Sequence, residues 1–347
     1  MFFPLWFTQK SWLIYFDLVV NTETGQMGDT FGGLMAPYIA MVAAGLTFMA
    51  FWVQYIANQN QRHDIQVERF ENKFYEMLRL HRDNVTEVEI AGNHNGRKAF
   101  IKMYEEFRYC YFMCHELLNS TDGERKWKKE EIDSKDFNEI AYSFFFFGGG
   151  PNSDIATEPL ESKFNKDFVK DLRLNIRTLQ SNYREYRDKI LKKNQNLSNT
   201  PYTGKLKHEG NTANLRIDYQ PLDGHSSKLG HYYRHLYQTV KFVDRYSESV
   251  VTRKEKYEYL KTLRAQLSNH EQALLYFNSF FVAGRKWYEE GFFLTWKIIK
   301  NLPFNLVRGV GIQPEEKFEE EIREKENIED KDLINARLGE LFDWIGG

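Results

Sequence analysis

Much of what usually reveals a protein's function is missing from this 347-residue chain. Its two cysteines, Cys110 and Cys114, are too few for a disulfide framework and fit a reducing compartment. A formal net charge of −2 gives the chain no general attraction for nucleic acid. The sequence contains no P-loop, Rossmann glycine fingerprint, nucleophile elbow, HExxH motif or EF-hand loop. We therefore expect no cofactor and no direct nucleic-acid binding, and conventional enzyme classes are disfavoured.

Charged side chains are absent from one long stretch, residues 31–53, which contains 23 residues. At 1.5 Å per residue, about 20 apolar residues in a helix cross the roughly 30 Å hydrocarbon core of a bilayer. Aromatic side chains, which favour the headgroup region, gather at the end of the stretch: Phe48, Phe51, Trp52 and Tyr55. The pattern predicts a transmembrane helix over residues 31–56, with a buried helix of a larger soluble fold as the alternative.

Small residues recur at every fourth position within this stretch, at Gly32, Ala36, Ala40 and Ala44. Lipid provides no hydrophobic drive between helices, so close backbone approach along such a row is a common way for membrane helices to associate. The row therefore predicts an oligomerisation face and a homo-oligomer. Alanine and glycine are frequent in membrane helices generally, so a row without any such role is the alternative.

Basic residues near the apolar stretch predict its orientation. Only Lys10 precedes it, whereas Arg62, Arg69 and Lys73 follow it closely. Under the positive-inside rule the large C-terminal part lies in the cytoplasm, in agreement with the two unpaired cysteines. Residues 1–30 are expected to form an extracytoplasmic or interfacial segment, or the remnant of a first span, with a turn at residues 22–33 before the helix.

The rest of the chain resembles a water-soluble, mainly α-helical protein. Apolar side chains keep a three-four spacing beyond the apolar stretch, at Val67, Phe70, Phe74, Met77 and His81. This spacing predicts that residues 57–82 continue the membrane helix as a stalk. Residues 83–310 are then expected to form a cytoplasmic α-helical domain with at most a small β hairpin, and residues 311–347 an acidic C-terminal segment. Helices are predicted at residues 97–118, 137–147, 167–191, 227–246 and 252–282.

One carboxylate, Glu271, falls on the apolar stripe of the last of these helices. A carboxylate that is buried on such a stripe needs a partner, which Arg234 or Arg264 can supply. Together with His231 and Asn278, these residues form a candidate polar cluster. The cluster either fixes how two helices pack or binds a ligand.

Two other patterns carry little information. His231 and His235 have metal-ligand spacing, but the sequence places no third and fourth ligand nearby, so we expect no metal. The pattern R-x(4-6)-H of the HEPN-type helical ribonucleases occurs at Arg108 with His115 and at Arg264 with His270. Two matches are about what the arginine and histidine content supplies by chance.

Three stretches, in this order, resemble a known family: GDTFGGLMAPYIAMVAAGLTFMAFWVQYIANQNQ at residues 28–61, GHYYRHLYQTVKFVD at residues 230–244 and LRAQLSNHEQALLYFNS at residues 263–279. They are similar to the phage abortive infection proteins of the AbiC-like group. The resemblance implies a bacterial membrane protein of anti-phage defence that stops growth or kills the infected cell, and it implies no catalytic mechanism. It also implies a hydrophobic span before residue 28, whereas residues 1–20 are interrupted by Lys10 and Asp17.

These inferences predict an antiviral abortive-infection effector or sensor of the bacterial inner membrane. The cytoplasmic helical domain is expected to sense infection, while the membrane helix anchors an oligomer or perturbs the membrane. The expected partners are the lipid bilayer, further copies of the chain, and a phage component or another defence protein. The alternative is a membrane-tethered enzyme, for example a HEPN-like ribonuclease.

Overall fold

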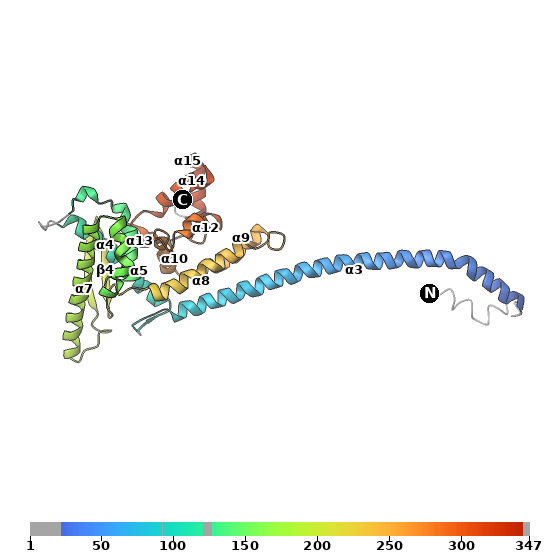
Figure 1. Ribbon diagram of the computed structural model, residues 1–347, viewed down its shortest axis with the longest axis horizontal. Helices are drawn as coiled ribbons and strands as arrows, with labels where there is room; N and C mark the ends of the chain where they lie inside the picture. Colours follow the sequence, from blue (N-terminus) through green and yellow to red (C-terminus); the bar gives the residue numbers. More distant parts are fainter. Residues whose placement is uncertain (1–21, 92, 121–126, 343–347) are drawn as a thin grey trace. The chain divides into compact units, whose positions relative to one another are not determined.

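The computed structural model describes residues 22–91, 93–120 and 127–342. Helices make up most of this part of the chain and are accompanied by two small antiparallel sheets, which confirms the predicted mainly α fold (Figure 1). The chain divides into two compact units, residues 1–69 and residues 70–347. Of the segment predicted at residues 1–30, residues 1–21 lie outside the described residues.

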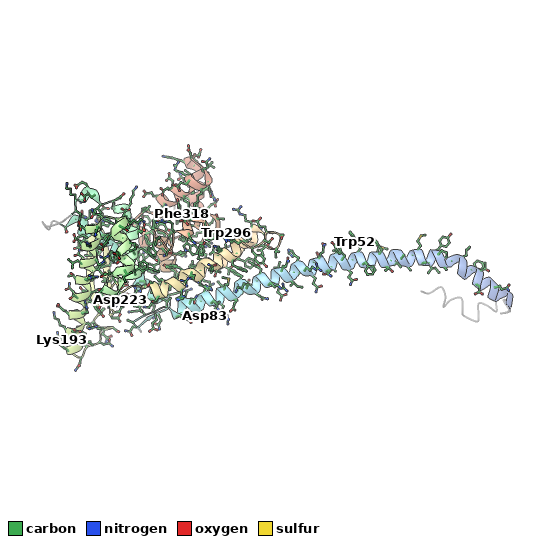
Figure 2. The ribbon with its side chains drawn as sticks, in the orientation of Figure 1. Trp52, Asp83, Lys193, Asp223, Trp296 and Phe318 are labelled. Atoms are coloured by element: carbon green, nitrogen blue, oxygen red, sulfur yellow. The ribbon has the colours of Figure 1, made fainter. Side chains whose placement is uncertain are left out.

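Helix α3, Thr22–Glu87, contains the apolar stretch. The turn predicted at residues 22–33 is wrong, because these residues are helical; each glycine there weakens a helix by only about 1 kcal/mol and no proline interrupts it. Within the described residues, α3 is the one helix that is long and apolar enough to cross a membrane, judged by length and composition. The large apolar side chains of the apolar stretch are exposed, as Trp52 shows where it projects from the ribbon (Figure 2).

The second unit contains residues 70–87 of α3 and the helices that follow. Their bounds are α4 Arg97–Asn119, α5 Phe137–Phe147, α6 Asp154–Lys163, α7 Lys166–Lys192, α8 Ser226–Asp244, α9 Arg253–Arg264, α10 Asn269–Asn278, α11 Lys286–Glu289, α12 Phe292–Trp296, α13 Phe304–Val307, α14 Pro314–Glu326 and α15 Lys331–Leu341. Single 3-10 turns occur at Lys129–Glu131, Ser134–Asp136 and Pro151–Ser153. The acidic C-terminal segment is thus helical within the described residues, and α14 packs on α15.

Both sheets are two-stranded antiparallel hairpins: β1 Glu89–Ile90 with β2 His94–Asn95, and β3 Tyr202–His208 with β4 Asn211–Ile217. Glu209 and Gly210 join β3 to β4 with φ values of 46° and 78°, the left-handed geometry of a tight two-residue hairpin turn. Every second residue in the last part of β4 is buried, namely Ala213, Leu215 and Ile217. This alternation turns one face of the hairpin toward α4.

Helix α4 lies at the centre of the second unit, against α5, α10 and both strands of the larger hairpin (Figure 1). Its Phe107 is fully buried, and its ring centroid lies 5.6, 5.9 and 4.6 Å from those of Tyr142, Phe145 and Phe277. Edge-to-face and tilted ring pairs of this kind stabilise a core beyond the burial of their surface. Part of the high aromatic content of the chain, 16%, therefore fills a helical core.

The single helix predicted for residues 252–282 is wrong, because α9 ends at Arg264 and α10 begins at Asn269. A capping box starts the new helix. The Ser268 hydroxyl accepts from the Glu271 backbone N–H at 3.3 Å, and the Glu271 carboxylate accepts from the Ser268 backbone N–H at 2.8 Å. Such a box satisfies two backbone donors that a helix start leaves unpaired. Glu271 therefore lies in the first turn of α10.

Candidate functional site

The last part of α3 lies beside α8 (Figure 1). It packs on α8 and α9 through aromatic side chains. Phe70 is fully buried; its ring stacks on Phe242 with centroids 5.3 Å apart and meets the ring of Tyr259 edge-on at 4.9 Å. The Tyr259 hydroxyl donates to the Glu71 carboxylate at 2.5 Å. We call the contact between residues 70–87 and residues 226–246 the α3–α8 interface.

Two histidines face each other across the α3–α8 interface, His81 on α3 and His235 on α8. Their ring centroids are 6.4 Å apart and their planes differ by 21°. His81 is 1% exposed, and within the described residues no ring nitrogen of either histidine has a hydrogen-bond partner. A neutral imidazole has one donor and one acceptor, so this pair carries unsatisfied polar atoms into the core.

The surroundings of the two histidines keep them uncharged. Burial, with smaller contributions from the nearby His235 and Arg97, lowers the pKa of His81 to about 4. Burial and, secondarily, the charge of Lys73 lower the pKa of His235. Loss of water penalises an imidazolium, and a neighbouring positive charge repels it. Both side chains are therefore neutral at pH 7.

Tyr232 links His81 to the buried carboxylate of Glu271. Tyr232 and Glu271 are each 1% exposed, and the tyrosine hydroxyl donates to Glu271 Oε1 at 3.0 Å. The rings of Tyr232 and His81 lie 5.3 Å apart between centroids. Arg97, the first residue of α4, places its Nε 4.0 Å from Glu271 Oε2. We call His81, Arg97, Tyr232, His235 and Glu271 the histidine–glutamate cluster; it joins α3, α4, α8 and α10.

The five residues predicted as a polar cluster lie in different environments. Glu271 and Asn278 are buried on α10, whereas His231 and Arg234 lie on the exposed face of α8. Arg264 is half-buried and donates to the backbone carbonyl of Lys297, the residue after α12, at 2.7 Å. Of these five, Glu271 alone belongs to the histidine–glutamate cluster.

The cation beside Glu271 differs from the two that the sequence suggested. Within the described residues its ion pair comes from Arg97 and not from Arg234 or Arg264. Arg97 is distant in sequence, on another helix, so no periodic pattern relates it to Glu271. Its side chain is 62% exposed, which screens the attraction between the two charges. Two hydrogen bonds therefore satisfy Glu271 inside the core, one from the Tyr232 hydroxyl to Oε1 and one from the Ser268 backbone N–H to Oε2.

A second buried pair, Glu106 on α4 with His225, was missed by the sequence analysis. Glu106 is fully buried and its carboxylate binds His225 Nε2. It also accepts from the backbone N–H of Leu222 at 3.3 Å. Leu222 has a φ of 50°, a strained conformation for a side chain of this kind, so the pair fixes the segment that leads into α8. The signal that singled out Glu271, a carboxylate on an apolar stripe, applies to Glu106 as well.

The R-x(4-6)-H residue His115 is also inside the core. It is 7% exposed, and its ring stacks on that of His208 with centroids 3.8 Å apart. Burial, together with His208, lowers the pKa of His115 to about 4. The Arg108 guanidinium lies over the ring of Phe112, 5.6 Å from its centroid. In this arrangement both members of the pair serve the packing of α4.

A comparison with protein families matches residues 224–307 to the family described as "Putative phage abortive infection protein". These residues form an AbiC-like region. The match begins just before α8 and ends at Val307, the last residue of α13. Two of the three stretches that carry the sequence resemblance lie inside it, and the resemblance is confirmed there. No curated protein and no solved structure matches the chain.

The AbiC-like region supplies three members of the histidine–glutamate cluster, Tyr232, His235 and Glu271. The other two, His81 and Arg97, come from α3 and α4, outside the matched residues. In the part of the chain that the structure describes, no group of three or more His, Cys, Asp or Glu side chains is placed to hold a metal ion. The cluster is thus one place where the AbiC-like region contacts the helix that also contains the apolar stretch; the contacts of Phe70 and Glu71 are another.

Proposed function

We propose that the chain is an abortive-infection protein of the bacterial inner membrane. In this proposal α3 anchors an oligomer, the cytoplasmic helical domain senses infection, and the membrane helices respond by perturbing the bilayer. The family match over residues 224–307 supports the defence role and is the observation that carries the proposal. Membrane anchoring, oligomerisation and sensing go beyond the family match, and each is supported by other features of the structure.

Membrane anchoring is supported by the apolar surface of α3. Leu34, Val42 and Phe48 are 66, 63 and 69% exposed, and the same holds for their large apolar neighbours. Each such side chain loses about 1.5–3 kcal/mol of favourable transfer energy when it is left in water, so a run of them needs a cover. A bilayer provides that cover for a helix of this length.

Oligomerisation is supported by the row Gly32, Ala36, Ala40 and Ala44 on α3. A Cβ added at Gly32 would meet no atom within 4 Å, so this face is open for another helix. Small side chains allow backbones to approach closely in lipid, where van der Waals packing drives association. The helix α3 of one chain cannot form a pore by itself, so a pore built from α3 requires several copies.

Sensing is assigned to the histidine–glutamate cluster as the link between the domain and the membrane helix. Tyr232 contacts both His81 of α3 and Glu271 of α10, so a rearrangement of α10 within the AbiC-like region changes the surroundings of His81. Residues 70–87 belong to the same helix as the apolar stretch. Packed side chains that join two helices in this way are a route by which coupling between distant sites can travel.

The enzyme alternative is not favoured. A HEPN-like ribonuclease needs an arginine and a histidine that reach RNA, and His115 is buried against His208. Its ring is held neutral, and Arg108 lies over Phe112. These contacts describe a packed core and not an accessible catalytic pair.

The proposal is tested by challenging cells that express the full chain with a panel of phages. Plaque number, membrane potential and RNA integrity are followed for wild type, for Ala36→Leu with Ala40→Leu, and for Val42→Leu with Met49→Leu. The last pair is the matched control, because at 100° per residue it lies on the opposite face of α3. His115→Ala with His270→Ala tests the enzyme alternative.

We expect wild type and the Val42/Met49 control to protect, with membrane potential lost after infection and RNA intact. The Ala36/Ala40 variant should lose both effects. Protection that disappears with the histidines, accompanied by RNA cleavage and an intact potential, would overturn the membrane proposal in favour of an enzyme. Unchanged protection by the Ala36/Ala40 variant would remove the role of the small-residue row.

A further inference from the structure

A groove of about 460 Å³ lies between α3 and α8, next to the histidine–glutamate cluster. Lys73 and Met77 line it from α3. The other lining residues come from α8 and the two residues that follow it: Gln238, Lys241, Phe242, Arg245 and Tyr246. Its volume falls in the range of small-molecule binding sites, roughly 300–1,000 Å³. The groove has no part in the function proposed above.

The charge of the groove is of one sign. Lys73, Lys241 and Arg245 line it, and no carboxylate does, within the described residues. Four other cavities of this unit each include at least one carboxylate in their lining: Glu87; Glu326 and Glu340; Glu116 and Asp171; Glu255 and Glu258. This groove is therefore the one among the five that attracts an anion without an acidic group to repel it.

The three cations are only partly neutralised. Glu290, outside the groove lining, lies 3.4 Å from Arg245 and 4.0 Å from Lys241. Lys73 forms no ion pair in the part of the chain that the structure describes, and its side chain is exposed. Lys241 is held in place by the ring of Tyr237, 5.3 Å from its Nζ. Glu76 also interacts electrostatically with Lys73, but its carboxylate is paired with Arg79 at 2.9 Å. The three cations of the groove lining therefore keep an excess of positive charge.

Two aromatic side chains form the floor of the groove, and the buried ring of Phe70 packs against both of them. Phe242 and Tyr246 contact each other with centroids 5.6 Å apart. Both rings also contact the buried Phe70, at 5.3 and 4.7 Å between centroids. With Met77 beside them, they offer an apolar surface on which the body of a ligand can lie while its anionic group reaches the cations.

We propose that this groove binds a ligand that carries a phosphate group on an apolar body. Lys73, Lys241 and Arg245 hold the phosphate, and Phe242 and Tyr246 hold the body. Two sources have this chemistry, a soluble nucleoside phosphate and the headgroup of an anionic phospholipid. Because Lys73 is on α3, Lys241 is on α8 and Arg245 directly follows α8, the bound phosphate ties the two helices together. That this ligand signals infection rests on the proposed function; the binding itself does not.

The test uses the purified full chain in detergent and measures binding by titration calorimetry. The soluble arm uses ATP, AMP and inorganic phosphate; the lipid arm uses short-chain phosphatidylglycerol with short-chain phosphatidylcholine as its neutral counterpart. The variant is Lys241→Gln with Arg245→Gln. The matched control is Arg253→Gln with Lys254→Gln, two cations that line another cavity of the same unit. Thermal melts of both variants report folding.

Saturable binding that weakens at least tenfold in the Lys241/Arg245 variant, and stays within twofold in the Arg253/Lys254 control, supports the proposal. Binding of a soluble phosphate identifies a nucleoside phosphate as the ligand, and binding of phosphatidylglycerol identifies an anionic phospholipid. Absence of saturable binding in both arms up to millimolar concentration overturns the proposal, and so does binding that the Lys241/Arg245 variant retains. If that variant melts early, Lys73→Gln alone, an exposed position, replaces it, with a loss of at least threefold expected.

Phage challenge separates this inference from the proposed function. Binding by a protein that protects against no phage leaves the groove standing and removes the defence role. Protection by a protein that binds neither class of probe supports the defence role and overturns ligand binding in the groove. Binding together with protection that falls in the Lys241/Arg245 variant supports both.

Discussion

Replacement of His81 by leucine should make the stability of the domain less sensitive to acid. His81 is almost fully buried, and both of its ring nitrogens lack partners within the described residues. Leucine removes these two polar atoms and the site of protonation while it keeps an apolar contact with Tyr232. Wild type and variant should therefore differ most in mildly acidic solution.

The size of the effect follows from the pKa of His81 in the two states. The pKa is 6.5 for an ordinary histidine and about 4 in the fold, mainly because of burial. Between these values the unfolded chain binds a proton that the folded chain does not, so the free energy of unfolding falls as the pH falls. At 1.36 kcal/mol per pKa unit the loss from His81 is about 2 kcal/mol at pH 5 and approaches about 3 kcal/mol at lower pH.

The assay is urea unfolding of the full chain in detergent, followed by tryptophan fluorescence at several pH values from about 7 to about 5. His231→Leu is the matched control, because it removes an exposed histidine from α8, one turn from His235. His81→Leu should lose about 2 kcal/mol less than wild type over this range, while His231→Leu follows wild type. Parallel losses in wild type and His81→Leu would refute the reasoning.

Further expectations concern the packing around the histidine–glutamate cluster and the loop between α13 and α14. Glu271→Ala strands the Tyr232 hydroxyl and removes the capping box of α10, so urea unfolding should show a loss of about 2–4 kcal/mol. Tyr232→Phe should lose about 1 kcal/mol, and Glu258→Ala, which breaks an exposed pair with Lys261, less than about 0.5 kcal/mol. Equal effects of Glu271→Ala and Glu258→Ala would contradict this ranking. Gly311→Ala should lower the melting temperature, because Gly311 has a φ of 66° and a Cβ there would lie 2.0 Å from Asn138 Oδ1. Gly339→Ala on α15, where a Cβ meets nothing within 4 Å, should leave the melting temperature unchanged or raise it, and a fall equal to that of Gly311→Ala would count against the argument.

Local patterns in the sequence predict the helices well and their partners poorly. The three-four stripe that includes Phe70, Phe74 and His81 marks the face of α3 that is buried in the structure. The stripe through Glu271 likewise predicts its burial. The spacing of apolar residues, and the buried face that it predicts, are properties of a single helix. Both can therefore be read from a short stretch of sequence.

Contacts between distant segments follow from the three-dimensional packing and not from any repeat. Arg97 reaches Glu271 from another helix, and His235 faces His81 across the α3–α8 interface. The break between α9 and α10 was readable in principle, since Ser268 and Glu271 form the S-x-x-E pattern of a capping box. The leucine periodicity across residues 260–274 concealed it. The positive groove is a product of the same packing, because Lys73 and Lys241 belong to different helices.

The central claim, that the chain defends against phage from within the membrane, is tested most directly by plaque counts on cells that express Val42→Arg. An arginine at the middle of the apolar stretch costs about 2.5–3.5 kcal/mol for insertion, so this variant should leave the membrane fraction while the helical domain stays folded. The account predicts that wild type reduces plaque numbers and that Val42→Arg does not. Full protection by Val42→Arg recovered in the soluble fraction, or no protection by wild type against any phage, would contradict it.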